Sequence, residues 1–488
     1  MLNTVLLSIT EKCNSNCKHC RAVKYHSDVD FDKARKIIDK ISNETKIVNI
    51  TGGEPLLYPQ IFQLIKYIKE KTSLKVSLST NAYLLGKKTA ITLKGLSLDG
   101  INISLDSIQP RKHDSFRGKK GAYKLAERGI KTAVGSGLNC RIACALGKFN
   151  YKEVEDLILK TCDLGCTAIS FRRILPISKA LIFLKPQLLN KNGLIYTLKK
   201  IYKALIFLYP YLNIYIQEPI DLYLSQKILK RKFSDFGGCS ACRTLVDIKT
   251  NGDVWPCFAL PIKLGNIYTQ SLREILKNPI SKSLICQNLQ GKCQICNLKQ
   301  ICGGCRAWAL YKTGNFLATD PFCFKNNCLE IIDALPNFEE KQHLDEKERT
   351  QIIFLTTKFM KPILNRSGIT WNSKILENDL KNNKGIFWLL KLKSKLAGYL
   401  WFTENDSQIY LKSVIIDDPY QKEHFGTFLI KRLELYAKRN NKEKICFAIQ
   451  TFNKKSFKFF TQLGYKKINK DRHKGFIFSK KFNQTALS

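Results

Sequence analysis

The sequence predicts an α/β protein built from more than one domain. Up to about residue 173, strand-like and helix-like runs alternate, as in a parallel sheet with crossover helices. A cysteine-rich stretch with short, glycine-punctuated elements follows at 237–330, and mixed α/β patterning returns at 351–488. A length of 488 residues fits this division, since domains commonly hold roughly 100–200 residues.

Six short apolar runs in the N-terminal part are expected to form buried strands: Val5–Thr10, Ile47–Ile50, Lys75–Ser79, Ile101–Leu105, Asn139–Leu146 and Ala168–Phe171. Helical patterns between them cover Phe31–Ile41, Ile61–Lys71, Tyr123–Val134 and Lys152–Leu164. Consecutive βα units predict a parallel sheet, either open or closed toward a barrel. The functional residues of such sheets gather at the carboxyl ends of the strands.

The remaining chain divides by its sequence pattern. Residues 180–235 are apolar and helical, whereas 336–350 are polar and charged and form the expected linker. Beyond the linker we expect strands at Ile386–Leu392, Lys395–Phe402, Gln408–Ile416 and Ile445–Gln450, and helices at 426–440 and Lys454–Leu463. The expected domains are therefore 1–225, 226–335 and 351–488.

The formal net charge is +41, and lysine outnumbers arginine 64 to 17. Such a charge is compatible with a polyanionic partner, but the excess is spread over the whole chain, which favours a compositional bias. We therefore expect neither a nucleic-acid nor a membrane partner. The N-terminus lacks a signal-peptide pattern, and the longest uncharged apolar run, roughly 204–217, is too short to span a bilayer. A cytoplasmic location is expected.

Eighteen cysteines are present, and only Cys446 lies beyond residue 330. In a reducing compartment this number indicates metal ligation rather than disulfides. Three of them, Cys13, Cys17 and Cys20, follow the first expected strand in CNSNCKHC. Three thiolates on one loop suit a cubane iron–sulfur cluster whose fourth iron stays open. The alternative is a zinc knuckle with His19 as the fourth ligand.

A glycine-rich motif, GGEP at Gly52, Gly53, Glu54 and Pro55, follows the second expected strand. Two glycines permit a close approach of a ligand to the backbone, and Glu54 offers a carboxylate to an ammonium group. Together with the three-cysteine loop, this motif resembles the core of radical S-adenosylmethionine (SAM) enzymes, which implies a partial (βα)6 TIM-like barrel. The resemblance covers residues 1 to about 175.

The resemblance extends to later strand ends: STN at Ser79–Asn81, SLD at Ser104–Asp106, and HDSFRG at His113–Gly118. It implies a [4Fe-4S] cluster on the three cysteines and reductive cleavage of SAM to a radical that abstracts hydrogen from a C–H bond. A reductant such as flavodoxin or ferredoxin is then required. The implied SAM-binding residues are Gly52, Gly53, Glu54, Pro55, Thr80, Asn81, Ser104 and Asp106; no catalytic residue is assigned.

Seven cysteines of the cysteine-rich stretch at 237–330, called here the second cysteine field, are hard to explain except as metal ligands: Cys242, Cys257, Cys293, Cys296, Cys302, Cys305 and Cys323. One or two structural zincs are the alternative. The pattern, with CGGCRAWA at Cys302–Ala309, resembles a SPASM auxiliary-cluster domain. It implies one cluster on Cys293, Cys296, Cys302 and Cys323, and another on Cys242, Cys257 and Cys305, with Cys239 as fourth ligand or with one iron open to a substrate thiolate. Three [4Fe-4S] clusters are thus expected. Most of the other cysteines are expected to be buried in the core.

The C-terminal pattern resembles the GNAT family of N-acetyltransferases, so acetyl-coenzyme A is an expected ligand. Its pyrophosphate would lie at a helix start near Gln421, Gly426 and Thr427, and Asn453 belongs to a later motif. Two departures stand out: His424 occupies a usual glycine position, and Phe460 stands where the family often has a tyrosine acid. A degenerate domain that only binds a ligand is the alternative.

The whole pattern favours a radical maturase of a ribosomal peptide that also N-acylates its product. The alternative is radical modification of a small molecule, such as a haem or cofactor precursor, with a degenerate GNAT-like domain. A tRNA-modifying function, as in the elongator catalytic subunit, fits less well, because that class of protein lacks this second cysteine field. A non-enzymatic scaffold is not expected because the radical motifs are intact.

Overall fold

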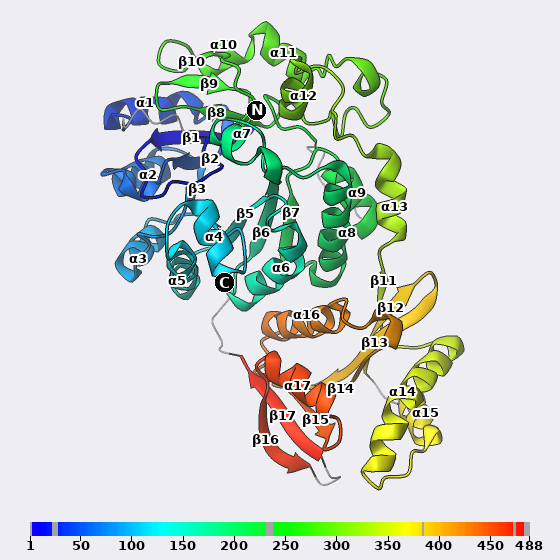
Figure 1. The fold of residues 1–488 in the computed structure, drawn as a ribbon. Coiled ribbons are helices and arrows are strands. Elements are labelled where there is room, and N and C mark those ends of the chain that lie inside the picture. Colours follow the sequence, from blue (N-terminus) through cyan, green and yellow to red (C-terminus); the bar gives the residue numbers. More distant parts are fainter. Residues whose placement is uncertain (1, 22–27, 231–237, 383–384, 472–474, 483–488) are drawn as a thin grey trace. The chain divides into compact units, whose positions relative to one another are not determined.

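A computed structural model describes residues 2–21, 28–230, 238–382, 385–471 and 475–482. The chain forms two compact units (Figure 1). Unit 1 comprises Met1–Tyr202 and Leu212–Ile332, and unit 2 comprises Lys203–Tyr211 and Asp333–Ser488. No helix in these described ranges has the length and apolar character that a bilayer crossing requires.

Unit 1 contains a ten-stranded sheet in the order β10-β9-β8-β1-β2-β3-β4-β5-β6-β7. The pairings from β8 through β1 to β7 are all parallel. The first six strands are β1 (Leu2–Thr10), β2 (Thr45–Gly52), β3 (Lys75–Thr80), β4 (Gly100–Ser104), β5 (Cys140–Leu146) and β6 (Ala168–Arg173). The six predicted strands are thus confirmed, within the expected partial TIM-like architecture.

Helices connect these strands and cover the outer face of the sheet: α1 (Phe31–Ile41), α2 (Ile61–Lys71), α3 (Lys87–Gly95), α4 (Pro110–Arg117), α5 (Ala122–Gly135) and α6 (Val154–Asp163). Alternate strand residues such as Val48, Val76 and Ile101 are fully buried. The intervening positions are polar, which is the period-two pattern of a strand with one apolar and one polar face. This polar face positions the candidate site.

The apolar segment after β6 is mainly helical, as predicted. It forms α7 (Lys179–Phe183), α8 (Lys191–Leu208) and α9 (Asp221–Leu229). The sequence pattern missed β7 (Asn213–Ile216), which pairs with β6 in parallel. The run NIYI is only four residues long and lies between two helices, so its alternation is too short to stand out.

The cysteine-rich segment contributes β8 (Leu245–Ile248), β9 (Asp253–Trp255) and β10 (Gly265–Asn266) to the same sheet. Its helices are α10 (Leu272–Leu276), α11 (Pro279–Ile285), α12 (Arg306–Thr313) and α13 (Cys328–Asp333). Because β8 pairs with β1 in parallel, the parts expected at 1–225 and 226–335 share one sheet within one compact unit.

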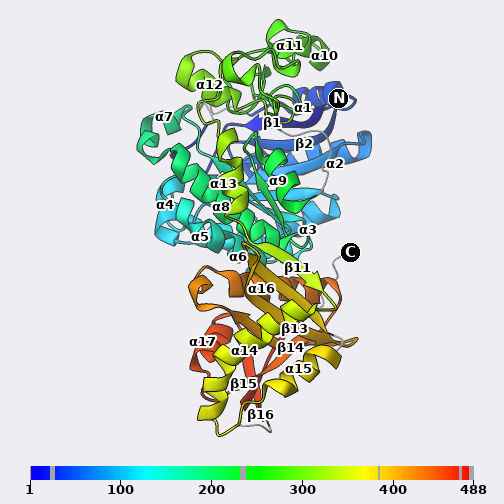
Figure 2. The same ribbon diagram turned by 90° about the vertical axis from the view of Figure 1, so that its right-hand side faces the viewer.

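Unit 2 contains a seven-stranded sheet in the order β11-β12-β13-β14-β15-β17-β16. Its strands are β11 (Asn337–Lys341), β12 (Ile386–Leu392), β13 (Lys395–Glu404), β14 (Gln408–Ile416), β15 (Lys444–Gln450), β16 (Lys466–Asp471) and β17 (Gly475–Lys481). Only β14 and β15 pair in parallel. Helices α14 (Glu346–Arg366) and α15 (Ser373–Asn382) lie on one side, and α16 (Phe425–Arg439) on the other; α17 (Lys454–Gln462) follows β15 (Figure 1 and Figure 2).

The expected linker at 336–350 is structured instead. Residues Asn337–Lys341 form β11 and pair with β12, and α14 begins at Glu346 with a capping box on Asp345. Polar residues dominated the sequence pattern because β11 is an edge strand. Its one aromatic residue, Phe338, packs against Trp388 with ring centroids 6.0 Å apart, and this contact accounts for its order.

Candidate functional site

A cavity of about 950 Å³ opens on the polar face of the unit 1 sheet. Its lining includes the thiol residues Cys13, Cys17 and Cys20 and the polar ends of the neighbouring strands. Of the predicted SAM-binding residues, six line this cavity: Gly52, Gly53, Glu54, Thr80, Asn81 and Ser104. Pro55 and Asp106 are not among the lining residues.

The glycines of GGEP allow close backbone packing between two loops. A Cβ at Gly52 would lie 2.2 Å from the Thr10 carbonyl oxygen, and one at Gly53 would lie 2.2 Å from that of Lys12. The Gly53 N–H donates to the Thr10 carbonyl at 2.7 Å. The sequence argument invoked a ligand approaching these glycines, but in the structure the approaching group is the start of the cysteine loop.

Glu54 is almost fully buried and organises the ends of β2 and β3. Its carboxylate accepts hydrogen bonds from the Thr80 hydroxyl at 2.5 Å, the Asn81 N–H at 2.8 Å and the Leu56 N–H at 3.1 Å. Burial raises the pKa of this carboxyl, although the three donors act in the opposite direction. The Asn81 amide continues to the cysteine loop, donating to Asn14 at 2.7 Å.

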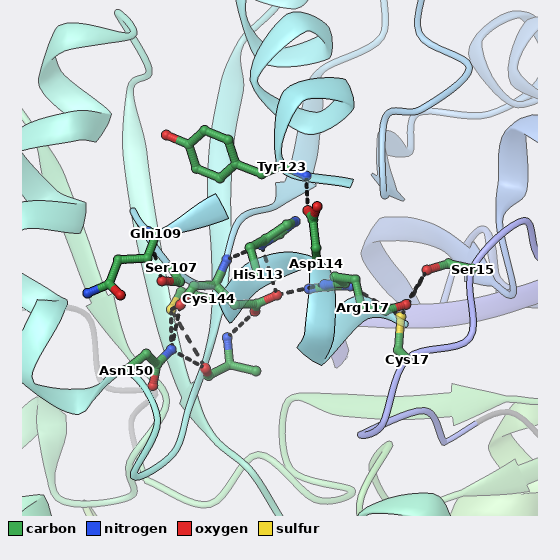
Figure 3. Close-up of polar contacts among 12 residues, drawn as sticks. Ser15, Cys17, Ser107, Gln109, His113, Asp114, Arg117, Tyr123, Cys144 and Asn150 are labelled. Carbon is green, nitrogen blue, oxygen red and sulfur yellow. Dashed lines mark hydrogen bonds and ion pairs between the residues drawn. The ribbon is translucent and has the colours of Figure 1, made fainter. Parts of the chain in front are cut away.

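A buried ion pair lies behind the cysteine loop (Figure 3). The Arg117 guanidinium donates through Nε to Asp106 at 2.6 Å, and its Nη1 lies 3.9 Å from the Cys17 sulfur. Asp106 also accepts the Ala145 N–H at 2.9 Å. Burial favours a higher pKa for Asp106, but the charge of Arg117 outweighs it and lowers the pKa. Asp106 was expected at the SAM site; instead it holds the arginine that faces the cluster loop.

His19, the candidate zinc ligand, stacks on Phe116 with ring centroids 4.4 Å apart and an interplanar angle of 3°. Burial and the charge of Arg117 lower its pKa to about 3. Partial desolvation raises the pKa of Cys13 to about 11, and the neighbouring thiols Cys17 and Cys20 contribute to the rise. Cys13 therefore lies within electrostatic range of the two other thiols of its loop, whereas His19 belongs to an aromatic stack.

The thiols of the second cysteine field fall into two groups, according to which thiols affect one another's pKa. Burial raises the pKa values of Cys242 and Cys257 to about 12, and the charge of Cys239 contributes to both rises. Burial also raises the pKa of Cys305 well above its usual value, and the charge of Cys239 contributes to that rise. These four thiols form the first group, and its position is fixed by a hydrogen bond from the Cys239 N–H to the Cys302 carbonyl at 2.8 Å.

The second group is Cys302 with Cys293 and Cys323. Burial raises the pKa of Cys302 to about 12, with contributions from the two other thiols. Cys296 lies in the same loop, where its sulfur accepts the Leu298 N–H at 3.4 Å. Arg306 approaches the Cys293 sulfur at 3.8 Å and donates to the Ala318 carbonyl at 2.7 Å. The grouping uses the cysteines of the partition that the SPASM resemblance implied, but no three His, Cys, Asp or Glu side chains of the described residues are placed as a metal site, so the cluster ligands stay a prediction.

The other cysteines lie mostly in the core. Buried positions hold Cys140, Cys144, Cys162, Cys166, Cys328 and Cys446, whereas Cys286 is exposed. Sequence reasoning did not identify three cavity residues, Arg21, Arg172 and Phe258. The available signal was positional: Arg172 alternates with the buried Phe171 and Arg173 at the carboxyl end of β6, so it faces the polar side of the sheet.

The expected coenzyme A loop lies between β14 and α16. Gln421 donates to the Ile416 carbonyl at 2.8 Å, and His424 precedes α16 with a left-handed φ of 60°. Glycine suits that conformation. A Cβ at Gly426 would meet side chains of Ile416 and Phe459 only at 3.7 Å, so the need for glycine is at position 424. Thr427 lies in the first turn of α16.

The later GNAT-like motif serves the fold. Asn453 was expected to bind the cofactor, but its side chain caps α17 by accepting the Ser456 N–H at 3.1 Å. Phe460 is buried and packs on Phe447, with ring centroids 4.2 Å apart. Both side chains therefore have structural partners.

Three family models match the chain in sequence. The radical SAM superfamily matches residues 7–160, an iron–sulfur cluster-binding (SPASM) domain matches residues 239–306, and the acetyltransferase (GNAT) family matches residues 356–465. The chain therefore contains radical SAM, SPASM and GNAT domains, in that order. The resemblances drawn from the residues are thereby confirmed, and the radical SAM domain indicates an enzyme.

Curated relatives of the radical SAM/SPASM part have different products. An AdoMet-dependent heme synthase of Methanosarcina barkeri is 27% identical over 329 residues, which cover 64% of this chain and 94% of the relative. The subtilosin biosynthesis protein AlbA of Bacillus subtilis is also 27% identical, over 61% of this chain and 65% of its own length.

Solved structures share the radical SAM/SPASM fold. SuiB of Streptococcus suis bound to S-adenosylmethionine has a TM-score of 0.56 at 20% identity, covering 66% of this chain and 77% of SuiB. The anSMEcpe structure with bound AdoMet has a TM-score of 0.54 at 19% identity, covering 67% of this chain and 95% of that one.

Proposed function

We propose that this protein uses SAM radical chemistry to modify a C–H bond in a ribosomal peptide. The observation that carries the proposal is the convergence of the three-cysteine loop and the Glu54 loop on one cavity. The proposed ligands of the SAM-binding [4Fe-4S] cluster are Cys13, Cys17 and Cys20. When bound, this cluster would supply one electron for reductive cleavage of SAM, provided by a donor such as flavodoxin or ferredoxin.

The residues of the chain would hold and orient the cofactor. Glu54 and Asn81 are positioned by the network between β2, β3 and the cysteine loop, and they offer a carboxylate and an amide to the amino-acid end of SAM. The wide polar cavity leaves room for a substrate beside it. Each auxiliary cysteine group would hold a further [4Fe-4S] cluster, with Cys239, Cys242, Cys257 and Cys305 in one, and Cys293, Cys296, Cys302 and Cys323 in the other.

Support for a peptide substrate comes from proteins similar to this chain. One solved structure, covering 76% of the matched protein, is SuiB bound to its precursor peptide SuiA, and AlbA serves the biosynthesis of a bacteriocin. A haem or cofactor precursor is the second candidate, because the match to the AdoMet-dependent heme synthase covers 94% of that protein.

We propose further that the GNAT domain binds acetyl-coenzyme A at the loop Gln421–Thr427 and acylates an amine of the same product. The first N–H groups of the helix that begins at Phe425 have no acceptor within the helix and would be offered to the pyrophosphate. Because Phe460 cannot donate a proton, the leaving thiolate would have to take its proton from elsewhere. Of the functional division predicted as 1–225, 226–335 and 351–488, the last boundary needs correction, because β11 and the start of α14 belong to unit 2.

Anaerobic reconstitution with a low-potential reductant and SAM tests the radical function. The parent should form 5′-deoxyadenosine, measured by mass spectrometry, and the triple variant Cys13→Ala/Cys17→Ala/Cys20→Ala should form none while it retains the iron of the two auxiliary clusters. Formation of 5′-deoxyadenosine by the triple variant would refute the assignment. Cys286→Ala, at an exposed position, is the matched control.

A further inference from the structure

Two arginines stack on one aromatic ring inside the cavity. The guanidinium carbons of Arg21 and Arg172 lie 4.4 Å and 3.8 Å from the ring centroid of Phe258, and all three residues line the cavity. Arg21 follows Cys20, Arg172 lies in β6, and Phe258 follows Cys257. The arrangement, the Arg21–Arg172 pair, thus joins the first cysteine loop to the first auxiliary group.

Neither arginine has a carboxylate partner within ion-pair distance in the described part of the chain. Arg172 donates to the neutral amide of Gln217, and Arg21 Nη1 is buried without an acceptor among the described residues. Two acidic groups raise the pKa of Arg172: Cys257, a proposed ligand of the first auxiliary cluster, and Asp247, which is already paired with Lys249 at 2.8 Å.

Two other arginines of the same cavity have acid partners, whereas a third, Arg141, has none at ion-pair distance among the described residues. Arg117 is paired with Asp106 at 2.6 Å, and Arg173 donates through Nη2 to Glu218 at 2.6 Å. The Arg21–Arg172 pair differs from Arg117 and Arg173 because it lacks such an acid, and it differs from Arg141 because its two guanidinium groups share one aromatic ring.

Two like charges on one ring are unfavourable without an anion. Burial and the charge of Arg21 together lower the pKa of Arg172 to about 9. The phenyl ring stabilises each cation only modestly, by about 0.5–2 kcal/mol. Guanidinium groups bind planar carboxylates through two parallel hydrogen bonds, so one carboxylate, or two on one molecule, would relieve the repulsion.

We propose that the Arg21–Arg172 pair is a carboxylate-binding site that anchors the substrate between the radical cluster and the first auxiliary cluster. This inference rests on the proposed function and narrows its substrate class to carboxylate-bearing molecules. The carboxylate is either an acidic residue of a peptide or an acid side chain of a small molecule such as a porphyrin propionate. The GGEP and STN motifs on β2 and β3 lie three to four strands from β6 in the sheet, whereas Ser104 on β4 lies two strands away, so a measurement of SAM affinity distinguishes a substrate anchor from a SAM contact.

Binding to the reconstituted full-length protein tests the anchor with defined probes. The first probe is a fluorescent pentapeptide with two glutamates, compared with the same peptide carrying glutamines. The second is a porphyrin with four propionates, compared with its tetramethyl ester. SAM affinity is measured in parallel by equilibrium dialysis. The variants are Arg21→Gln, Arg172→Gln, their double variant and Arg172→Lys, with the exposed Arg273→Gln as matched control.

At least one acidic probe should bind about tenfold or more tightly than its neutral counterpart, as expected for a hydrogen bond to a charged group. The double variant should lose this preference, Arg172→Lys should keep part of it, and Arg273→Gln should keep all of it. The probe that binds identifies the source of the carboxylate. SAM affinity should change by less than about twofold.

Equal binding of acidic and neutral probes to the parent would overturn the inference, and that comparison needs no variant to fold. A preference that persists in the double variant would overturn it as well. A parallel loss of SAM affinity would assign the pair to the carboxylate of SAM instead. Formation of 5′-deoxyadenosine by the parent is scored separately, so failure of the anchor is distinct from failure of the radical function.

Discussion

Replacing Arg117 by methionine should destabilise unit 1 by about 3 kcal/mol at neutral pH. Among the described residues Arg117 is the only permanent cation at ion-pair distance from Asp106, since burial lowers the pKa of His113, 3.7 Å away, to about 4; the substitution therefore leaves a fully buried carboxylate without a cation at pH 7. Breaking a buried pair in this way costs about 3–5 kcal/mol. The lower end is expected because Asp106 keeps the hydrogen bond from the Ala145 N–H. This loss is a large fraction of a typical total stability of about 5–15 kcal/mol.

Urea denaturation of the cluster-free chain, followed by far-ultraviolet circular dichroism, measures the change. For an m value of about 3 kcal/mol per molar, the midpoint of the unit 1 transition should fall by about 1 M. Asp106→Asn and the double variant complete a double-mutant cycle, with an expected coupling of about 2–3 kcal/mol. Lys69→Met is the matched control, because its partner Asp99 is 31% exposed; it should cost about 1 kcal/mol or less.

The pH dependence of the stability deficit distinguishes loss of the ion pair from loss of packing, because only the ion pair predicts the sign of the change. In the parent, the lowered pKa of Asp106 contributes stability above its unfolded value, and this contribution is lost as the pH falls through the folded pKa. In Arg117→Met, burial without the cation raises the folded pKa above the unfolded value. The deficit should therefore shrink as the pH is lowered from 7 toward 5. A coupling below about 0.5 kcal/mol, or a deficit that grows on acidification, would refute the ion-pair argument.

Three further predictions follow from specific positions. Gly53→Ala should displace the cysteine loop, because its Cβ would lie 2.2 Å from the Lys12 carbonyl oxygen; iron analysis should show about four irons fewer, and full iron content would contradict the packing argument. Cys239→Ala should weaken only the auxiliary cluster proposed on Cys242, Cys257 and Cys305, seen as partial iron loss that Cys286→Ala does not cause. His424→Gly should stabilise the start of α16 by about 1 kcal/mol and tighten acetyl-coenzyme A binding in calorimetry on the full chain; weaker binding would mean that the imidazole itself contacts the ligand.

Most elements of the fold could be predicted from the periodicity of apolar residues in the sequence. The buried strands of unit 1 and the meander β12–β14 are regular apolar runs, so their positions were predicted within a few residues. The missed elements β7 and β11 are short or polar. These strands form because they pair with segments distant in sequence, as β11 does with β12. A local sequence pattern does not show such pairing.

The candidate site was predictable where spacing alone defines it. The three cysteines and GGEP were found because motif and strand end coincide. Asp106 and Asn453 were assigned by motif position, yet one holds Arg117 and the other caps α17. The Arg21–Arg172 pair was not predictable, because its members and Phe258 lie on three segments that meet only in the folded unit.

The auxiliary cysteine groups bear on how a substrate would be held. The sequence left open whether the first auxiliary cluster has a free iron for a substrate thiolate. In the structure Cys239 influences the pKa of both Cys257 and Cys305, which favours Cys239 as the fourth thiol of the proposed cluster. A cluster with four protein ligands would have no position for a substrate and would be suited to electron transfer. Side chains of the protein would then have to orient the substrate, and the proposed Arg21–Arg172 anchor lies beside both cysteine loops.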